Sequence, residues 1–183
     1  MSRGPGALPR PERRFGAGGV SRGGGGVRAP GRGCEDPGVT RVKVRRLPHH
    51  EGLPLPTRQT PGASGYDLAS AEPDFVLEPL ERRLVRTGLA LAIPPGIEGQ
   101  VRPRSGLALK HGLTLPNAPA TIDSDYRGEL LIPMINLGTE PVEVKRGSRI
   151  AQLVFQRVEA VTLDEVVELP ASARGEGGFG STG

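Results

Sequence analysis

The last ten residues of the chain combine the side chains and the backbone freedom that binding a nucleoside triphosphate requires. Five of the residues in 174–183 are glycine, so the backbone there can approach a ligand closely and direct N–H groups toward it. Arg174 offers a planar guanidinium that suits phosphate, Ser181 and Thr182 add hydroxyls, and Phe179 can stack on a base. The segment fits either a flexible lid over a nucleotide or a solvated glycine-rich tail.

Two earlier segments place polar groups where phosphate chemistry would need them. Arg104, Ser105 and the N–H of Gly106 stand at a possible helix start, which forms either an anion site or an ordinary capped turn. Asp123 and Asp125 are two residues apart. On a strand they would share one face and could activate water or handle a metal, whereas Asp-Ser-Asp before Arg-Gly is also turn chemistry.

Cysteine and histidine provide no metal site in this sequence. Cys34 is the only cysteine, which excludes an internal disulfide and a cysteine-based zinc site. His49, His50 and His111 lack the spacing of metal ligands, and we expect them at the surface.

Short apolar or β-branched runs recur along the chain and must supply the elements that position these groups. Glycine and proline separate the runs at intervals of roughly 8–12 residues, which is typical of an all-β sandwich or barrel. The exception is a helical turn expected at Ser105–Lys110, which Ser105 would cap. The runs cover residues 39–45, 84–93, 97–102, 129–136, 142–144, 149–158 and 161–169.

Composition divides the chain into three parts: a disordered extension at residues 1–38, a β-domain at 39–170, and a glycine-rich arm at 171–183. The first part holds 12 glycines and almost no large apolar side chains, so it cannot bury enough surface to offset its ordering entropy. It also carries the whole net charge of +4, because residues 39–183 contain 17 basic and 17 acidic residues.

The charge distribution and hydropathy limit the partners of the main domain. A neutral domain gives no reason to expect nucleic-acid binding, although the arginines of residues 1–38 fit either a nucleic-acid contact or a dispensable extension. No stretch approaches the ~20 apolar residues of a membrane span, and the N-terminus has no apolar run typical of a secretory signal. We therefore expect a cytoplasmic protein without membrane association.

Taken in order, five segments resemble the five motifs of the trimeric deoxyuridine triphosphatases (dUTPases), in the bacterial branch. The resemblance runs from about Val42 to Gly183, and five motifs in sequence are far more specific than any one of them. Ala120 stands where the family often has glycine, and Ser148 stands where it usually has an acid. The matching segments are Ser64–Leu68, Pro103–Ala108, Ile122–Gly128, Arg149–Gln152 and Arg174–Gly183.

The resemblance implies a distorted β-barrel of jelly-roll type in a homotrimer. Three active sites would lie between subunits, and the C-terminal arm of one subunit would close a site formed by the other two. The implied reaction is hydrolysis of dUTP to dUMP and pyrophosphate, with water attacking the α-phosphorus.

The resemblance also implies roles for the reacting and base-reading residues. Asp123 would orient and deprotonate the water and hold the 3′-hydroxyl, and Gln152 would help hold the water or a phosphate. Tyr126 would pack flat against the sugar and exclude a 2′-hydroxyl. Asn117 would read the uracil edge together with the neighbouring backbone, which includes Thr121 and Ile122.

Other residues would hold the phosphates. Mg²⁺ is implied as the cofactor, bound mainly by the substrate phosphates, because it keeps waters and uses few protein ligands. Asp67 would act in the phosphate and metal shell through water, and Arg174 would reach the γ-phosphate as a third catalytic group. Phe179 would lie over the uracil. Arg104, Ser105 and Gly106 would hold the phosphates, with Ser181 and Thr182 beside the γ-phosphate. Gly180 is a further substrate-binding residue that the resemblance implies.

Two other functions remain open on the sequence. A dCTP deaminase of similar fold would need a general acid or base near the cytosine ring, and the base-reading segment shows no obvious spare glutamate. A non-catalytic nucleotide-binding module would be marked by loss of Asp123, Arg174 or Phe179, and all three are present.

Overall fold

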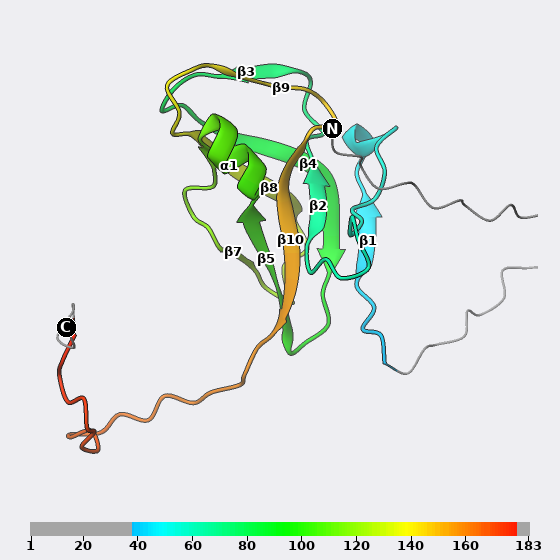
Figure 1. The fold of residues 1–183 in the computed structure, drawn as a ribbon. Coiled ribbons are helices and arrows are strands. Elements are labelled where there is room, and N and C mark those ends of the chain that lie inside the picture. Colours follow the sequence, from blue (N-terminus) through cyan, green and yellow to red (C-terminus); the bar gives the residue numbers. More distant parts are fainter. Residues whose placement is uncertain (1–37, 179–183) are drawn as a thin grey trace, which may run out of the picture. The chain divides into compact units, whose positions relative to one another are not determined.

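The structure is a computed structural model that describes residues 38–178. Its strands belong to one compact unit that begins at Thr40 (Figure 1). The disorder expected for residues 1–37 and the last arm residues, 179–183, lie outside the described part of the chain. None of the helices between residues 38 and 178 has the length and apolar character needed to cross a bilayer.

All strand pairs in the described residues are antiparallel, and they form two four-stranded sheets and one separate pair. The order is β1-β4-β8-β6 in the first sheet and β2-β10-β5-β7 in the second, and β3 pairs with β9. The elements are β1 (Lys43–Arg46), the 3₁₀ turn η1 (Pro48–His50), β2 (Tyr66–Ala69), β3 (Phe75–Leu77), β4 (Arg82–Ala92), β5 (Ile97–Pro103), α1 (Ser105–His111), β6 (Leu113–Thr114), β7 (Ala120–Ile122), β8 (Glu129–Asn136), β9 (Val142–Val144) and β10 (Arg149–Arg157).

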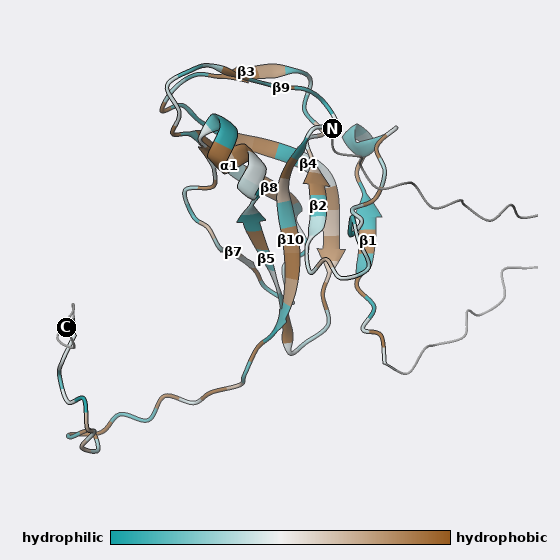
Figure 2. Cartoon of the chain, in the orientation of Figure 1, coloured by the Kyte–Doolittle hydropathy of each residue, from teal (hydrophilic) through white to brown (hydrophobic). Residues whose placement is uncertain are grey.

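The core lies between the two four-stranded sheets and consists mainly of aliphatic side chains. On β8, burial alternates from residue to residue, as the pleat of a half-buried strand requires. Hydrophobic stretches along β4, β8 and β10 supply most of the packing surface (Figure 2). The fully buried aliphatic residues come from both sheets and include Leu68, Val85, Val101, Leu130, Ile132 and Leu153.

The all-β prediction is confirmed, but several of its details are not. Two sheets without strand pairing between them make the predicted barrel an open one within residues 38–178. The run 161–169 forms no strand, because no neighbouring strand of its own chain pairs with it in the structure. The strands β2, β3, β6 and β7 were not predicted, because they are short and lie within polar, turn-rich sequence.

The sequence analysis expects His50 at the surface, and this expectation is wrong. The residue is buried, with an exposed fraction of only 1%. Its Nδ1 lies 2.8 Å from the carbonyl oxygen of Thr87. Gly88 has a φ of +68°, and a Cβ there would come within 2.6 Å of the His50 Cβ, so glycine is required on both grounds. The neighbouring His49 Nε2 lies 2.7 Å from Glu129 Oε1 at the start of β8.

A partly buried polar contact fastens the loop after β2 to β4. The carboxylate of Glu72 accepts two hydrogen bonds from Arg86, one from Nε at 2.6 Å and one from Nη2 at 3.1 Å. This bidentate hydrogen bond holds the pKa of Glu72 below its usual value, and partial burial opposes the shift. The contact fixes the chain directly after the segment that carries Asp67.

Candidate active site

The helix α1 begins where β5 ends and brings Arg104, Ser105 and Gly106 together. Arg104 has extended backbone angles of −92° and 125°, and its carbonyl accepts the N–H groups of Leu107 and Ala108 at 3.1 and 3.0 Å. Arg104 is therefore the N-cap residue, without a side-chain cap. The prediction that Ser105 caps the helix is wrong, since Ser105 is the first helical residue.

Asp67 on β2 holds two arginines that the sequence places far apart. Its Oδ1 lies 3.1 Å from Nε of Arg104, and its Oδ2 lies 2.9 Å from Nη1 of Arg149. Nη1 of Arg104 also donates to the Arg149 carbonyl at 2.9 Å. One carboxylate between two guanidiniums leaves one net positive charge, which favours a phosphate ligand.

Arg149 contacts Asp67, and the sequence reasoning did not name it among the candidate site residues. It stands directly before Ile-Ala-Gln in the fourth motif segment, and that position was the available signal. The pairing of β10 with β2 explains its contact with Asp67, because the ladder sets Gln152 opposite Asp67 and shifts register between Arg149 and Ala151.

Gln152 is oriented by the strands on both sides of β10. Its Nε2 donates to the Pro103 carbonyl at 3.0 Å, so its amide lies beside the end of β5. Gly65 passes directly over this side chain: a Cβ at residue 65 would lie 3.2 Å from Gln152 Cδ and still closer to Oε1. Glycine at position 65 therefore leaves the space that the Gln152 amide occupies.

Asp67, Arg104 and Gln152 line one cavity of about 430 Å³, whereas Arg149, the other partner of Asp67, does not line it. The structure thus brings together the predicted residues of the first, second and fourth motifs. The lining also includes Gly65, which was not among the predicted site residues, whereas Asp123, Tyr126, Asn117 and Arg174 do not line it. The predicted residues in the lining are Asp67, Arg104, Ser105, Gly106 and Gln152.

The third motif lies at the opposite end of β5. β7 pairs with β5 so that Ile122 faces Gly99 and Ala120 faces Val101. Asp123 therefore lies beside Glu98 near the start of β5, while Arg104 follows the end of that strand. Six residues at ~3.4 Å each separate the two positions by about 20 Å. Asp123 lines a different cavity, of about 560 Å³, together with Glu98 and Asp125.

Asp123 and Asp125 lie in a turn rather than on a strand, which decides between the two alternatives that their spacing allows. The N–H of Tyr126 donates to the Asp123 carbonyl at 3.2 Å. Nη1 of Arg127 donates to the carbonyls of Ser124 and Tyr126 at 2.6 and 2.8 Å and ties the turn together. Asp123 is exposed, as is Asn117 in the turn before β7.

Thr121 and Ile122 flank this turn on β7, where they pair with Gln100 and Gly99. Their main chain therefore belongs to a sheet and not to a mobile loop. Any ligand that reads this main chain would meet it at the edge of the second sheet, since β7 is the last strand in the order.

Arg174 is the one predicted site residue of the arm that lies within the described part of the chain. It is exposed, and its Nε donates to the Gly177 carbonyl at 2.6 Å. The predicted ligands Phe179, Gly180, Ser181 and Thr182 lie outside the described residues. Between β10 and residue 178 there is neither helix nor strand, and residues 158–176 are all exposed.

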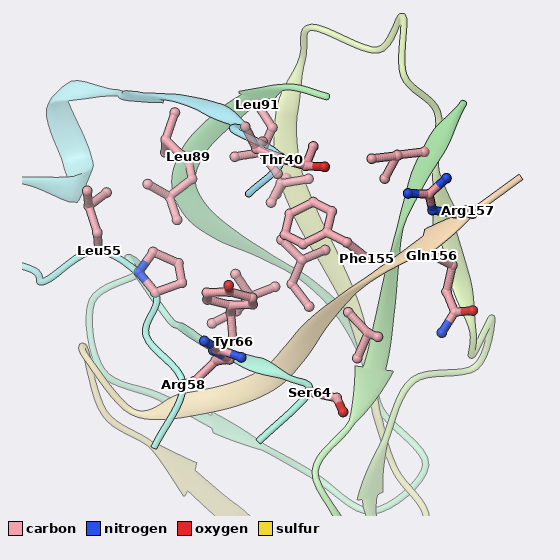
Figure 3. Close-up of a pocket in the computed structure, with 18 residues that line it drawn as sticks. Thr40, Leu55, Arg58, Ser64, Tyr66, Leu89, Leu91, Phe155, Gln156 and Arg157 are labelled. Atoms are coloured by element: carbon pink, nitrogen blue, oxygen red, sulfur yellow. The ribbon is translucent and has the colours of Figure 1, made fainter. Parts of the chain in front are cut away.

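A larger apolar cavity of about 610 Å³ lies elsewhere, among residues of β1, β2, β4 and β10 (Figure 3). Tyr66 and Phe155 meet there edge to face, with ring centroids 5.9 Å apart, and the Arg58 guanidinium lies 5.8 Å from the Tyr66 ring (Figure 3). No predicted site residue lines this cavity. Its apolar walls suit packing against protein better than phosphate chemistry.

A metal ion at this cavity would meet few protein ligands among the described residues. No group of three His, Cys, Asp or Glu side chains within residues 38–178 is placed to hold a metal ion. Asp67 is the one carboxylate of the described chain that lines the cavity of about 430 Å³, and both of its oxygens contact arginines. A single carboxylate is compatible with Mg²⁺, which uses few protein ligands and retains several of its waters.

Comparison with known proteins gives one consistent answer. The dUTPase family model matches residues 51–183. The deoxyuridine 5′-triphosphate nucleotidohydrolases of Zymomonas mobilis and Methylocella silvestris are 55% and 58% identical, over 78% of this chain and 97% and 91% of theirs.

Solved structures agree. The Staphylococcus bacteriophage 80alpha dUTPase with dUPNHPP has a TM-score of 0.71 and 31% identity over 79% of this chain and 99% of that chain. A mutant dUTPase from phage phi11 of S. aureus, described with a structural Mg(II) ion, has a TM-score of 0.65 and 26% identity over 72% and 100%.

Proposed function

The chain belongs to the dUTPase family and is a dUTP diphosphatase, and we propose that water attacks the α-phosphorus of dUTP to release dUMP and pyrophosphate. The observation that carries this mechanism is the cavity that joins Asp67, Arg104 and Gln152, since it offers cationic and amide groups to a polyphosphate. A triphosphate is the anionic part of the substrate that such a cavity would recognise.

Arg104 and Arg149, which both contact Asp67, act as a pre-oriented pair where the phosphates would bind. Asp67 fixes both guanidiniums before substrate binds, so less side-chain freedom is lost when phosphate oxygens arrive. Ser105 and Gly106 add N–H groups from the first turn of α1, where helical hydrogen bonds are not yet made.

Mg²⁺ would be held mainly by the three phosphates, with Asp67 contacting it through water. Bound there, it would neutralise charge on the phosphates and favour departure of pyrophosphate. The described residues supply the cationic surroundings of the phosphates and the orientation of the triphosphate.

The reacting water would be oriented by Asp123, with Gln152 holding the water or a phosphate oxygen. The water oxygen forms the new bond to the α-phosphorus, its proton passes to the Asp123 carboxylate, and the bond to the bridging oxygen breaks. A carboxylate is a weak base at its reference pKa of about 4, so positioning must supply much of the rate.

Selection of base and sugar falls to the segment around β7. Asn117 and the main chain of Thr121 and Ile122 would read the uracil edge. Tyr126, at 43% exposure, would offer its ring to the deoxyribose and exclude a 2′-hydroxyl. From the arm, Arg174 would reach the γ-phosphate, Phe179 would cover the uracil, and Gly180, Ser181 and Thr182 would lie beside the phosphates.

We propose a homotrimer with active sites between subunits, and two observations support it. Asp123 and Arg104 lie at opposite ends of β5, so one copy cannot present both groups to the same phosphate. Residues 161–169 also alternate as a strand does, yet their apolar side chains are exposed; Val161, Leu163, Val167 and Leu169 are 77%, 94%, 102% and 83% exposed. A second copy would cover them.

Mixing two inactive variants tests this arrangement. Asp123→Asn and Arg104→Ala should each be inactive alone, because each removes a different half of every site. Co-refolded in equal amounts, they should regain activity in about a quarter of the sites, where an intact half from each variant meets. Mass measurement by light scattering should show three chains. Mixed oligomers that form but stay inactive would contradict the shared site.

The activity itself is tested by pyrophosphate release from the purified protein. We expect release from dUTP and almost none from dCTP. A deaminase of similar fold would instead release ammonia from dCTP, and a non-catalytic module would bind dUTP without releasing pyrophosphate. Either of these results would reject the hydrolytic mechanism.

A further inference from the structure

Tyr126 is held at three places in the turn between β7 and β8. The N–H of Tyr126 donates to the Asp123 carbonyl, and Nη1 of Arg127 donates to the carbonyl of Tyr126. The main chain of Tyr126 is therefore held on both sides. Its hydroxyl donates to the carbonyl of Glu129 at 2.9 Å. The ring is therefore positioned at both ends, although the residue is exposed.

Gly128 lies where an added side chain would meet the ring of Tyr126. A Cβ at residue 128 would lie 2.5 Å from Cζ and 3.0 Å from Cε2 of Tyr126, closer than such carbon atoms approach, and nearer still to the hydroxyl oxygen. The φ of Gly128 is not in the left-handed region, so an L-residue could adopt this backbone. Glycine is needed at position 128 for space and not for conformation.

The carbonyl that receives the Tyr126 hydroxyl is itself anchored. The side chain of Glu129 accepts the N–H of Gly88 at 2.7 Å and contacts His49 Nε2 at 2.7 Å. The start of β8 is thus fixed to β4 and η1, and the hydroxyl of Tyr126 is bound to a fixed point. Any displacement forced by a group at residue 128 must be taken up by the exposed ring.

We infer that Gly128 is a positioning residue for sugar selection, because its missing side chain lets the Tyr126 ring stand where it excludes a 2′-hydroxyl. This inference rests on the role proposed above for Tyr126. Exclusion of one hydroxyl by contact requires a side chain that does not move aside, and a ring held at its hydroxyl and through its main chain meets that requirement. A methyl group at position 128 would move the ring without removing it.

The test compares the kcat/KM values for dUTP and UTP in Gly128→Ala, Tyr126→Ala and the double variant. In Gly128→Ala we expect the value for UTP to rise and the dUTP/UTP ratio to fall about tenfold or more, the range that contact selection supplies. Gly38→Ala is the matched control, since a Cβ there would meet nothing within 4 Å, and it should leave the ratio unchanged.

The double variant should show the same ratio as Tyr126→Ala alone, because the methyl group has no ring left to displace. If Gly128→Ala fails to fold, the double variant should fold, and a double variant that also fails would overturn the inference. An equal loss of activity toward dUTP and UTP in Gly128→Ala would overturn it as well, since a purely structural defect gives that result.

Failure of the inference and failure of the role proposed for Tyr126 give different results. An unchanged ratio in Tyr126→Ala would reject Tyr126 as the residue that excludes a 2′-hydroxyl, and the inference with it. A lowered ratio in Tyr126→Ala with an unchanged ratio in Gly128→Ala would overturn the role of Gly128 alone.

Discussion

Asp123→Asn is expected to abolish turnover while leaving dUTP affinity within about tenfold of the wild-type value, because asparagine keeps the size and hydrogen bonding of the side chain and removes the base. Asp123 is exposed in a turn whose main chain is tied by Tyr126 and Arg127, so the substitution should not disturb the fold. Loss of rate with retained binding is the mark of a group that acts in the transition state.

Single-turnover hydrolysis and equilibrium binding of a non-hydrolysable dUTP analogue measure the two effects separately. Asp125→Asn is the matched control, since it removes a carboxylate two residues away in the same turn and should keep most of the rate. A single-turnover rate near wild type in Asp123→Asn would reject the assignment of the base. A comparable loss in both variants would indicate a general charge effect.

Truncation after Ala173 should give a folded protein that binds dUTP weakly and hydrolyses it about 10³-fold more slowly or worse, the loss expected when an arginine that stabilises phosphate charge is removed. The described fold supports retained folding, because residues 158–176 are exposed and add nothing to the core between the sheets. Ordering the ten removed residues costs on the order of 10 kcal/mol at about 1 kcal/mol each, so several ligand contacts must form together.

Phe179→Trp gives a direct readout of arm closure in a chain without tryptophan. Its fluorescence should change strongly with a non-hydrolysable dUTP analogue and little with pyrophosphate, because only the analogue offers a base to stack on. An equal response to both ligands would reject stacking on uracil. If neither ligand changes the fluorescence, the arm does not close over the nucleotide.

The local sequence pattern predicted strands whose side chains on one face are buried in the core. Glu129–Asn136 and Val142–Val144 match β8 and β9 at both ends, because short runs of apolar and β-branched residues between turn signals indicate strands. The same pattern at residues 161–169 predicted a strand that is absent in the described chain. Pairing needs a neighbouring strand, and whether another chain supplies one is not written in local sequence.

Contacts between distant segments were the part of the site that sequence reasoning could not reach. Asp67 and Arg149 are 82 residues apart and meet only because β2 pairs with β10 in one register. The close passage of Gly65 over Gln152 depends on the same register. The motifs therefore indicated which residues take part, whereas their partners within the fold required the structure.

The placement of Asp123 and Arg104 at opposite ends of β5 has a consequence for how the enzyme responds to its own abundance. In the proposed assembly a lone chain carries every reacting group and yet possesses no complete site. Dilution below the dissociation constant of the oligomer would then silence catalysis while each subunit kept its core intact. Specific activity would rise with protein concentration, and newly made chains would stay inactive until they assembled with other copies of the same chain.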